Sequence, residues 1–265
     1  MLKKLVKYDL RFIVNKVLVI YYIVALCMAV VTRLMFGINN SVFFNVVAQI
    51  CSSITISAMF GILINNVIRC WVRFKQNFYA DESYLTHTLP IGKSTHYAAK
   101  FFSAVGSLLI SFAAIVLTLI VAYYSKENFE FVKQLLVPFA ENFDSSVWKL
   151  MLLLVLVVFA ELLTMIQAGY IGIVLGHRFN SGKTALSVLF GGVAYLISQS
   201  LVLLCTFLIA LCDREGLMQI FTQNTLSEVS VLKTLIYIVL AIYTVLLAIG
   251  YVWNVHLFKK GVNVD

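Results

Sequence analysis

Long apolar runs separated by short polar stretches dominate the chain. Six of these runs approach or exceed the roughly 20 residues with which an α-helix crosses the hydrocarbon core of a bilayer. They extend approximately over 17–36, 46–68, 98–124, 150–175, 184–211 and 232–254. The pattern predicts an all-α integral membrane protein with six transmembrane helices.

The stretches between these runs are too short for a second globular domain. The two longest are residues 69–97 and 125–149, whereas a domain contains at least about 50 residues. We therefore expect residues 1–265 to form a single transmembrane domain.

The composition agrees with membrane insertion. Hydrophobic residues make up 62% of the chain and charged residues 12%, whereas soluble domains carry about 25% charged residues. The 5 cysteines and 4 histidines show no paired spacing typical of a disulfide framework or a zinc site. We predict no metal site and no catalytic residue.

The distribution of basic residues predicts the orientation. One set of loops and ends carries Lys3, Lys4, Lys7, Arg11, Lys16, Arg69, Arg73, Lys75, Lys93, Lys100, Arg178, Lys183, Lys259 and Lys260. The other carries only Arg33, Lys126, Lys133, Lys149, Arg214 and Lys233. Because the basic side of a membrane protein faces the cytoplasm, both termini are predicted to be cytoplasmic. The net charge of +8 then reflects the orientation of the protein in the membrane. The sequence contains no basic patch interleaved with aromatic residues, so we expect no nucleic-acid partner.

Residues 1–16 predict an amphipathic helix that precedes the first span. On a helical projection Lys3, Lys4, Lys7 and Arg11 lie opposite an arc of leucine, valine, isoleucine and phenylalanine. Such a helix lies along the inner membrane surface, with its basic side toward anionic lipid headgroups. Asp9 projects into the apolar arc. Two interpretations remain open for it: pairing with a basic residue of another cytoplasmic segment, and snorkelling to the surface.

The segment 69–97, between the second and third runs, contains a predicted short helix. Asp81 and Glu82 suit its positive N-terminal end, and Pro90 forces Leu89 out of the helical region. The apolar residues on and beside this helix are Phe78, Tyr84, Leu85 and Leu89. They indicate either an exposed docking surface or a loop that folds back onto the bilayer.

The string FYADESYLTHTLPIGKSTHYAAK resembles the first cytoplasmic loop of type-2 ABC transporter permeases from Gram-positive bacteria. The family pattern is approximately Asp-Glu-Gly-Tyr-Leu, two or three residues, Thr-Leu-Pro, and a polar stretch that ends in Lys. The matching residues are Asp81, Glu82, Tyr84, Leu85, Thr88, Leu89, Pro90 and Lys100. Ser83 stands where the family has Gly. The rest of the chain resembles the family more loosely, through its basic start, six runs and Lys-rich end.

The resemblance implies an architecture and a set of partners. The N-terminal helix corresponds to an elbow helix, and the short loop helix to a coupling helix that docks on a separate ABC ATPase subunit. The implied coupling residues are Phe78, Asp81, Glu82, Tyr84, Leu85, Thr88, Leu89 and Pro90. Two permease and two ATPase subunits would export an amphipathic peptide, drug or lipid-like molecule across a bacterial cell membrane. Residues 212–231 would form a segment that re-enters the outer leaflet.

ATP and Mg are expected on the partner, and this chain is expected to hold no cofactor and to have no enzymatic activity of its own. The stretch GHRFNSGKT resembles a phosphate-binding loop, but five residues separate Gly176 from Gly182. A phosphate loop has four at this point and follows a strand. We interpret these residues as the cytoplasmic turn between the fourth and fifth runs.

Two polar residues lie deep within apolar runs. Glu161 is near the middle of the fourth run, and Gln199 lies at similar depth in the fifth. A charge at the bilayer centre costs on the order of 2.5–3.5 kcal/mol on insertion scales, so Glu161 needs a partner or a proton. One interpretation places both residues on the translocation path or a dimer seam. The other is a neutral, hydrogen-bonded contact between helices.

Two other functions remain open from the sequence. A non-transporting immunity or sensing subunit of the membrane would have the same span pattern. An intramembrane enzyme would need a catalytic pair at membrane depth, where Glu161 is the only acidic residue and no histidine lies in the core of a run.

Overall fold

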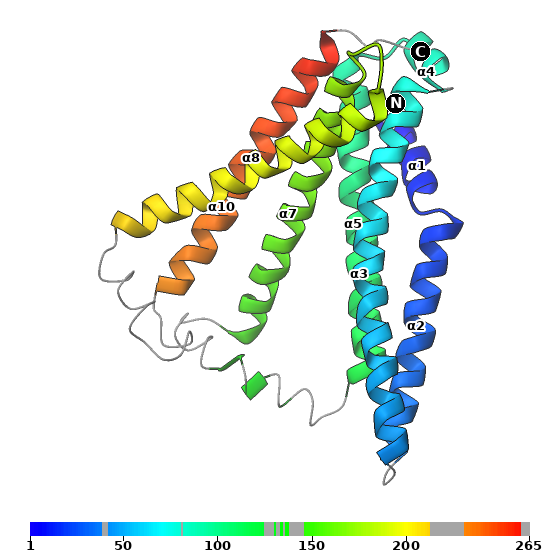
Figure 1. Cartoon of the computed structure of the whole chain (residues 1–265), viewed down its shortest axis with the longest axis vertical. Helices are drawn as coiled ribbons and strands as arrows, with labels where there is room; N and C mark the ends of the chain where they lie inside the picture. The colour runs from blue at the N-terminus through cyan, green and yellow to red at the C-terminus, as the bar shows by residue number, and fades with distance from the viewer. Residues whose placement is uncertain are drawn as a thin grey trace. The chain divides into compact units, whose positions relative to one another are not determined.

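The computed structural model describes residues 1–38, 42–80, 82–124, 146–212 and 231–260, together with residues 130, 133, 134, 136 and 137. All regular elements in these ranges are α-helices (Figure 1). Six of them are long and apolar enough to cross a membrane. They are α2 (Lys16–Gly37), α3 (Val42–Tyr79), α5 (Lys93–Tyr123), α7 (Val147–Gly176), α8 (Lys183–Cys212) and α10 (Val231–Lys259). The prediction of an all-α protein with six membrane-spanning helices is confirmed to this extent, while the side that each terminus faces stays a prediction.

The chain divides into two compact units, Met1–Phe129 and Glu130–Asp265. The first contains α1 (Leu2–Ile13), α2, α3, α4 (Ser83–Thr88) and α5, and the second contains α7, α8 and α10. The single domain expected over 1–265 stays a prediction.

In the first unit, α1 and α2 are separate helices because Asn15 caps the second one. The Asn15 side chain accepts hydrogen bonds from the backbone N–H groups of Val17, at 3.0 Å, and Leu18, at 3.5 Å. Helix α1 packs against α5 and α3. Its basic residues Lys3, Lys4, Lys7 and Arg11 are exposed on the other side, as the helical projection predicts.

Polar side chains join the three long helices of this unit. Asn66 of α3 donates to the carbonyl of Ser107 at 2.9 Å and to the hydroxyl of Ser111 at 2.6 Å, both on α5. Tyr22 of α2 shares a 2.9 Å hydrogen bond with the same Ser111. Buried amides and hydroxyls are thereby satisfied between helices, as apolar surroundings require.

Helix α3 is longer than the second apolar run. The sequence predicts a non-spanning segment over 69–97, but α3 continues without a break to Tyr79, and α5 already begins at Lys93. The sequence shows a loss of apolar character after residue 68. This loss does not end the helix, because neither glycine nor proline occurs between 69 and 79. The connection between α3 and α5 is therefore confined to residues 80–92, and α4 lies within it.

In the second unit, α7 and α8 form an antiparallel pair with very close backbones. A methyl group added to Gly172 would overlap the backbone of Ser187 and Gly191, and one added to Gly176 would overlap Ser187. Small residues spaced four apart permit such close packing between membrane helices. The turn 177–182 joins the pair and ends at Gly182, whose φ of 67° lies in the left-handed region that glycine adopts without strain.

Candidate functional site

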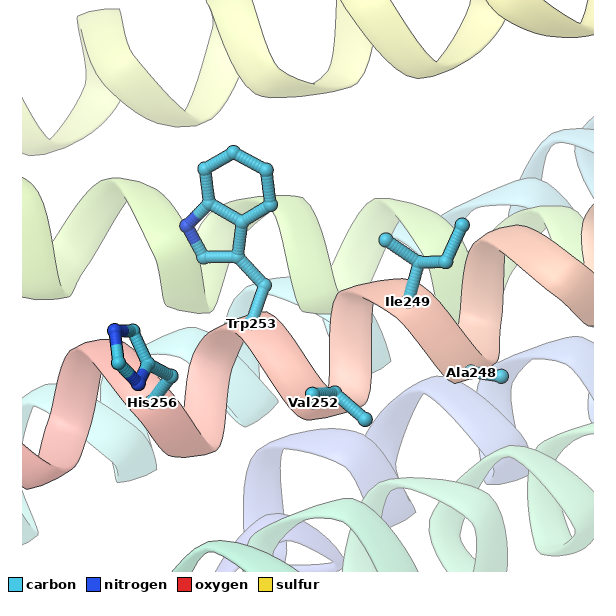
Figure 2. A pocket seen from close by; sticks show the side chains of 5 residues that line it. All are labelled: Ala248, Ile249, Val252, Trp253 and His256. Atoms are coloured by element: carbon cyan, nitrogen blue, oxygen red, sulfur yellow. The ribbon is translucent and has the colours of Figure 1, made fainter.

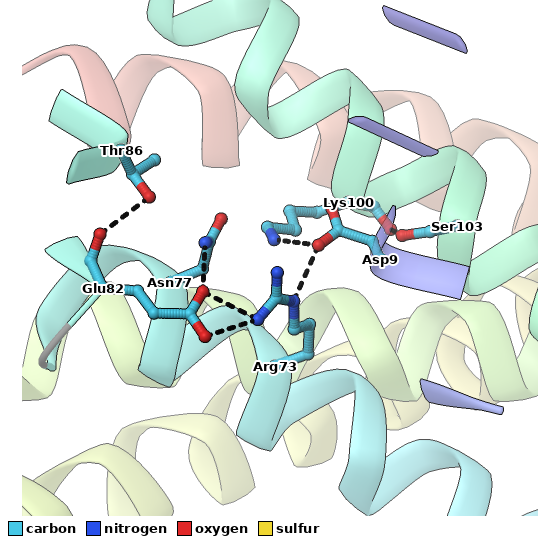
Figure 3. Close-up of polar contacts among 7 residues, drawn as sticks. All are labelled: Asp9, Arg73, Asn77, Glu82, Thr86, Lys100 and Ser103. Atoms are coloured by element: carbon cyan, nitrogen blue, oxygen red, sulfur yellow. Dashed lines mark hydrogen bonds and ion pairs between the residues drawn. The ribbon is translucent and has the colours of Figure 1, made fainter. Parts of the chain in front are cut away.

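Asp9 is the centre of a buried network of charged groups at the end of the first unit where α1, α3, α4 and α5 meet (Figure 3). Its Oδ1 accepts from Arg73 Nε and from Lys100 Nζ, each at 2.7 Å. The Asp9 and Lys100 side chains are only 5% and 3% exposed. Of the two interpretations left open by the sequence, pairing with basic residues of other segments is therefore correct.

Arg73 links Asp9 to the start of α4. Its Nη1 donates to Glu82 at 2.8 Å and 3.0 Å, one bond to each carboxylate oxygen, while its Nε bonds to Asp9. Asn77 donates a further hydrogen bond of 2.9 Å to Glu82. One guanidinium thus binds a carboxylate of α1 and the carboxylate of the residue before α4, a use of its separate donors that a lysine cannot reproduce.

Aromatic rings cover the two cations. The guanidinium carbon of Arg73 lies 4.5 Å from the centre of the Phe12 ring, and Lys100 Nζ lies 5.2 Å from that of Phe78. With two carboxylates and two cations, the network of Asp9, Arg73, Glu82 and Lys100 is balanced in charge. Balance and complete pairing are what allow ionised groups to remain buried.

Helix α4 presents apolar side chains above this network. Tyr84 is 65% exposed, Leu85 74% and Leu89 45%. On the opposite side of the helix, Ser83 and Thr86 are buried. Tyr84 and Leu85 of α4, together with Leu89 directly after it, are called here the exposed face of α4, and His87 and Thr88 are exposed beside them.

The ends of α4 follow the sequence prediction in part. Leu89 is extended, with φ −66° and ψ 134°, and the helix ends before Pro90. Glu82 precedes the first turn as expected, but its carboxylate makes no capping bond and binds Arg73 and Asn77 instead. Thr88 is exposed and donates to the carbonyl of Leu85 at 2.9 Å. Asp81 lies outside the described residues.

From the sequence, Phe78 is grouped with Tyr84, Leu85 and Leu89, but Phe78 is not exposed as those three residues are. Its side chain is completely buried at the end of α3. It packs edge-on against Phe74, with ring centres 4.9 Å apart, and against His96 at 6.1 Å. Because α3 continues as a helix to Tyr79, Phe78 turns inward and supports α4 from beneath.

Glu161 and Gln199 lie in the second unit, within one polar cluster of α7, α8 and α10. The hydroxyl of Tyr195 donates to Glu161 at 3.2 Å, and that of Tyr243 donates to the Gln199 side-chain oxygen at 3.2 Å. Glu161 and Gln199 thus each bond to a tyrosine of another helix and not directly to one another. The two tyrosines were not identified from the sequence, because nothing distinguishes them from the other tyrosines of the chain.

An apolar pocket of about 520 Å³ lies along α10 (Figure 2). Ala248, Ile249, Val252, Trp253 and His256 line it. Trp253 is 57% exposed near the end of the helix, a position that suits an indole ring at the membrane interface.

Over the described ranges, no group of three or more His, Cys, Asp or Glu side chains is placed to hold a metal ion. Comparisons with protein-family models, with curated proteins and with solved structures found no match. The class that the fold defines is that of a multi-pass membrane protein with six apolar helices.

Proposed function

We propose that the chain is the transmembrane permease subunit of an ABC exporter in a bacterial cell membrane, with both termini in the cytoplasm. In this proposal a separate ATPase subunit, which holds ATP and Mg, docks on the exposed face of α4. A second permease subunit, identical or related, completes the transporter. The cargo is an amphipathic peptide, drug or lipid-like molecule. The elbow helix of the proposal is α1, and its basic residues anchor it to the lipid surface.

The observation that carries the proposal is the way in which α4 is held. A six-residue helix has too few backbone hydrogen bonds to be stable alone. Here Glu82, at its start, is fixed through Arg73 to Asp9 of α1 and to the body of α3. Such an arrangement suits an element that receives force from a docked subunit, because displacement of α4 would pull on α1 and α3 together.

The proposal is tested by co-purification of Mg-dependent ATPase activity with the tagged full-length chain from its native membrane. Replacing both Tyr84 and Leu85 by aspartate should remove the activity, because two charges would interrupt the apolar face. The matched control is Gln76→Asp, which adds a charge at an exposed position on α3. Activity that survives the double substitution, or is lost equally in the control, contradicts docking on α4.

Efflux from membrane vesicles distinguishes an exporter from a non-transporting immunity or sensing subunit. Vesicles that contain the chain and its ATPase should export the cargo only when ATP is supplied. An ATPase that co-purifies through α4 without any ATP-dependent efflux would favour the non-transporting function.

A further inference from the structure

The apolar pocket along α10 follows the axis of the helix toward its C-terminal end (Figure 2). Its volume of about 520 Å³ is typical of clefts that bind ligands. The lining residues run from Ala248 to His256, so the pocket extends for about 12 Å at 1.5 Å per residue. One leaflet of a bilayer contains about 15 Å of hydrocarbon, half of the whole core. The pocket therefore has a length comparable to that of one leaflet.

The face of α10 that carries the pocket continues to two lysines. At 100° per residue, Lys259 and Lys260 fall within the arc between Ala248 and Trp253. The backbone N–H of Lys260 donates to the carbonyl of His256 at 3.3 Å, so the helical geometry extends to this residue. Both lysines are exposed. This face of α10 is thus apolar along the pocket and cationic at its C-terminal end.

A neighbouring turn adds a third cation at this end of α10. Arg178, in the turn between α7 and α8, donates from Nη2 to the carbonyl of Leu257 at 3.3 Å. Neither this turn nor α10 contains an acidic residue. Within the described part of the chain, Arg178, Lys259 and Lys260 form no salt bridge. The positive charge at this end is therefore not neutralised by described acidic side chains, and it favours an anionic ligand.

The charge of this face disfavours a second copy of the chain as its occupant. Two copies inserted in the same direction would pair this face symmetrically, because a two-fold interface uses the same surface of both subunits. Lys259 and Lys260 of one copy would then meet the same lysines of the other, and like charges in contact oppose association. A lipid has the complementary distribution, since its chains are apolar and its headgroup can carry a negative charge.

We propose that the face of α10 from Ala248 to Lys260 binds a phospholipid with an anionic headgroup. One acyl chain lies in the pocket against Ile249 and Val252, and the lipid phosphate accepts hydrogen bonds from the ammonium groups of the two lysines. Clusters of basic residues beside membrane helices recognise anionic headgroups in this way. Trp253, between the apolar and the cationic part, has the position that indole rings prefer at the headgroup boundary. The site does not depend on the proposed exporter.

The test measures how strongly brominated phospholipids quench Trp253 in nanodiscs that contain the full chain. Trp71→Phe and Trp148→Phe leave Trp253 as the single tryptophan. The nanodiscs consist of phosphatidylcholine with a minor fraction of dibrominated phosphatidylglycerol or, in parallel, of dibrominated phosphatidylcholine. The relative binding constant should favour the anionic lipid by about fivefold or more, the attraction that a single lysine exerts on an anionic membrane surface.

Two pairs of substitutions show which residues cause the preference. Lys259→Gln combined with Lys260→Gln should reduce it below about twofold, because the headgroup loses both ammonium groups. The matched control, Lys3→Gln combined with Lys4→Gln, removes the same charge from exposed positions of α1 and should keep the preference. An excess of glycerol 3-phosphate should not relieve the quenching, because this anion has no acyl chain for the pocket.

Equal quenching by the two brominated lipids would overturn the proposal and make the pocket an ordinary contact with the bilayer. Weak quenching by both lipids would also overturn it, since a protein surface would then cover the pocket. A preference that survives the substitution of Lys259 and Lys260, or is lost in the control, would attribute the attraction to the charge of the whole chain. Relief of the quenching by glycerol 3-phosphate would reduce the site to one for small anions.

Should the single-tryptophan chain fail to fold, native mass spectrometry of the chain with all its tryptophans decides the question. Offered equal amounts of both lipids in detergent, the unmodified chain should retain phosphatidylglycerol in preference to phosphatidylcholine. The chain with Lys259→Gln and Lys260→Gln should retain both lipids equally. Equal retention by the unmodified chain overturns the proposal.

Discussion

Replacing Asp9 by asparagine tests the buried charge network most severely. The substitution keeps the size of the side chain but leaves Arg73 and Lys100 as two cations around a neutral group. Removing one partner of a buried ion pair typically costs about 3–5 kcal/mol. The Glu82 side chain is 46% exposed, so solvent screens its pair with Arg73, and Glu82→Gln should cost only about 1 kcal/mol. Asp9→Asn should therefore be the more destabilising substitution by about 2 kcal/mol or more.

Cys70 provides the assay. It is buried one turn before Arg73, and its thiol contacts Asn66 and Ser107. In a chain whose other four cysteines are replaced by alanine, the rate of Cys70 modification by a maleimide reports local opening of this end of the unit. Since 1.4 kcal/mol corresponds to a factor of ten, Asp9→Asn should raise the rate by about 100-fold or more. Glu82→Gln should raise it by less than about tenfold.

A double substitution tests the cause of the effect. Lys100→Met removes the second cation, so it should recover part of the stability lost in Asp9→Asn. The two substitutions should then be non-additive by about 1–3 kcal/mol. A rate for Asp9→Asn no higher than that for Glu82→Gln, or strict additivity with Lys100→Met, would refute the view that Asp9 holds two buried cations.

Three further substitutions test other parts of the account. Gly176→Leu should separate α7 from α8, because a side chain there meets the backbone of the neighbouring helix, at a cost of about 1–3 kcal/mol or more. Size-exclusion profiles and thermal melting should show this, while Gly192→Leu should behave like wild type, because a Cβ added at Gly192 has no atom within 4 Å. Asn66→Leu should accelerate Cys70 modification, since it leaves buried polar groups of α5 unpaired at about 1–3 kcal/mol. Arg73→Lys keeps the charge but cannot bind both carboxylates, so ATPase co-purification should fall although Cys70 remains protected.

The span pattern was predictable because hydrocarbon imposes one requirement that the sequence displays directly. An apolar run of sufficient length must become a helix, since every backbone polar group has to be satisfied within it. Helix ends in water are set by other forces. The continuation of α3 to Tyr79 could not be read from hydropathy, and with it the inward rotation of Phe78 was missed.

The sequence singles out some residues of the candidate site, but it does not show which residues they contact. The position of Asp9 on the apolar face of α1 left pairing and snorkelling equally open, and deciding for a pair with Arg73 and Lys100 requires the packing of α1 on α5 and α3. The spacing of Gly172 and Gly176 is a recognisable signal of close helix packing. The sequence does not show that Ser187 and Gly191 of α8 form the surface against which these glycines pack, because this depends on the tertiary structure.

The position of α4 relative to the membrane tests the central claim most directly. In a chain without native cysteines, Leu85→Cys places one thiol on the exposed face of α4. A membrane-impermeant maleimide should leave this thiol unlabelled in intact cells and should label it in inside-out vesicles, because an ATPase subunit can dock only from the cytoplasm. Labelling in intact cells would place α4 outside the cell and contradict the proposed permease.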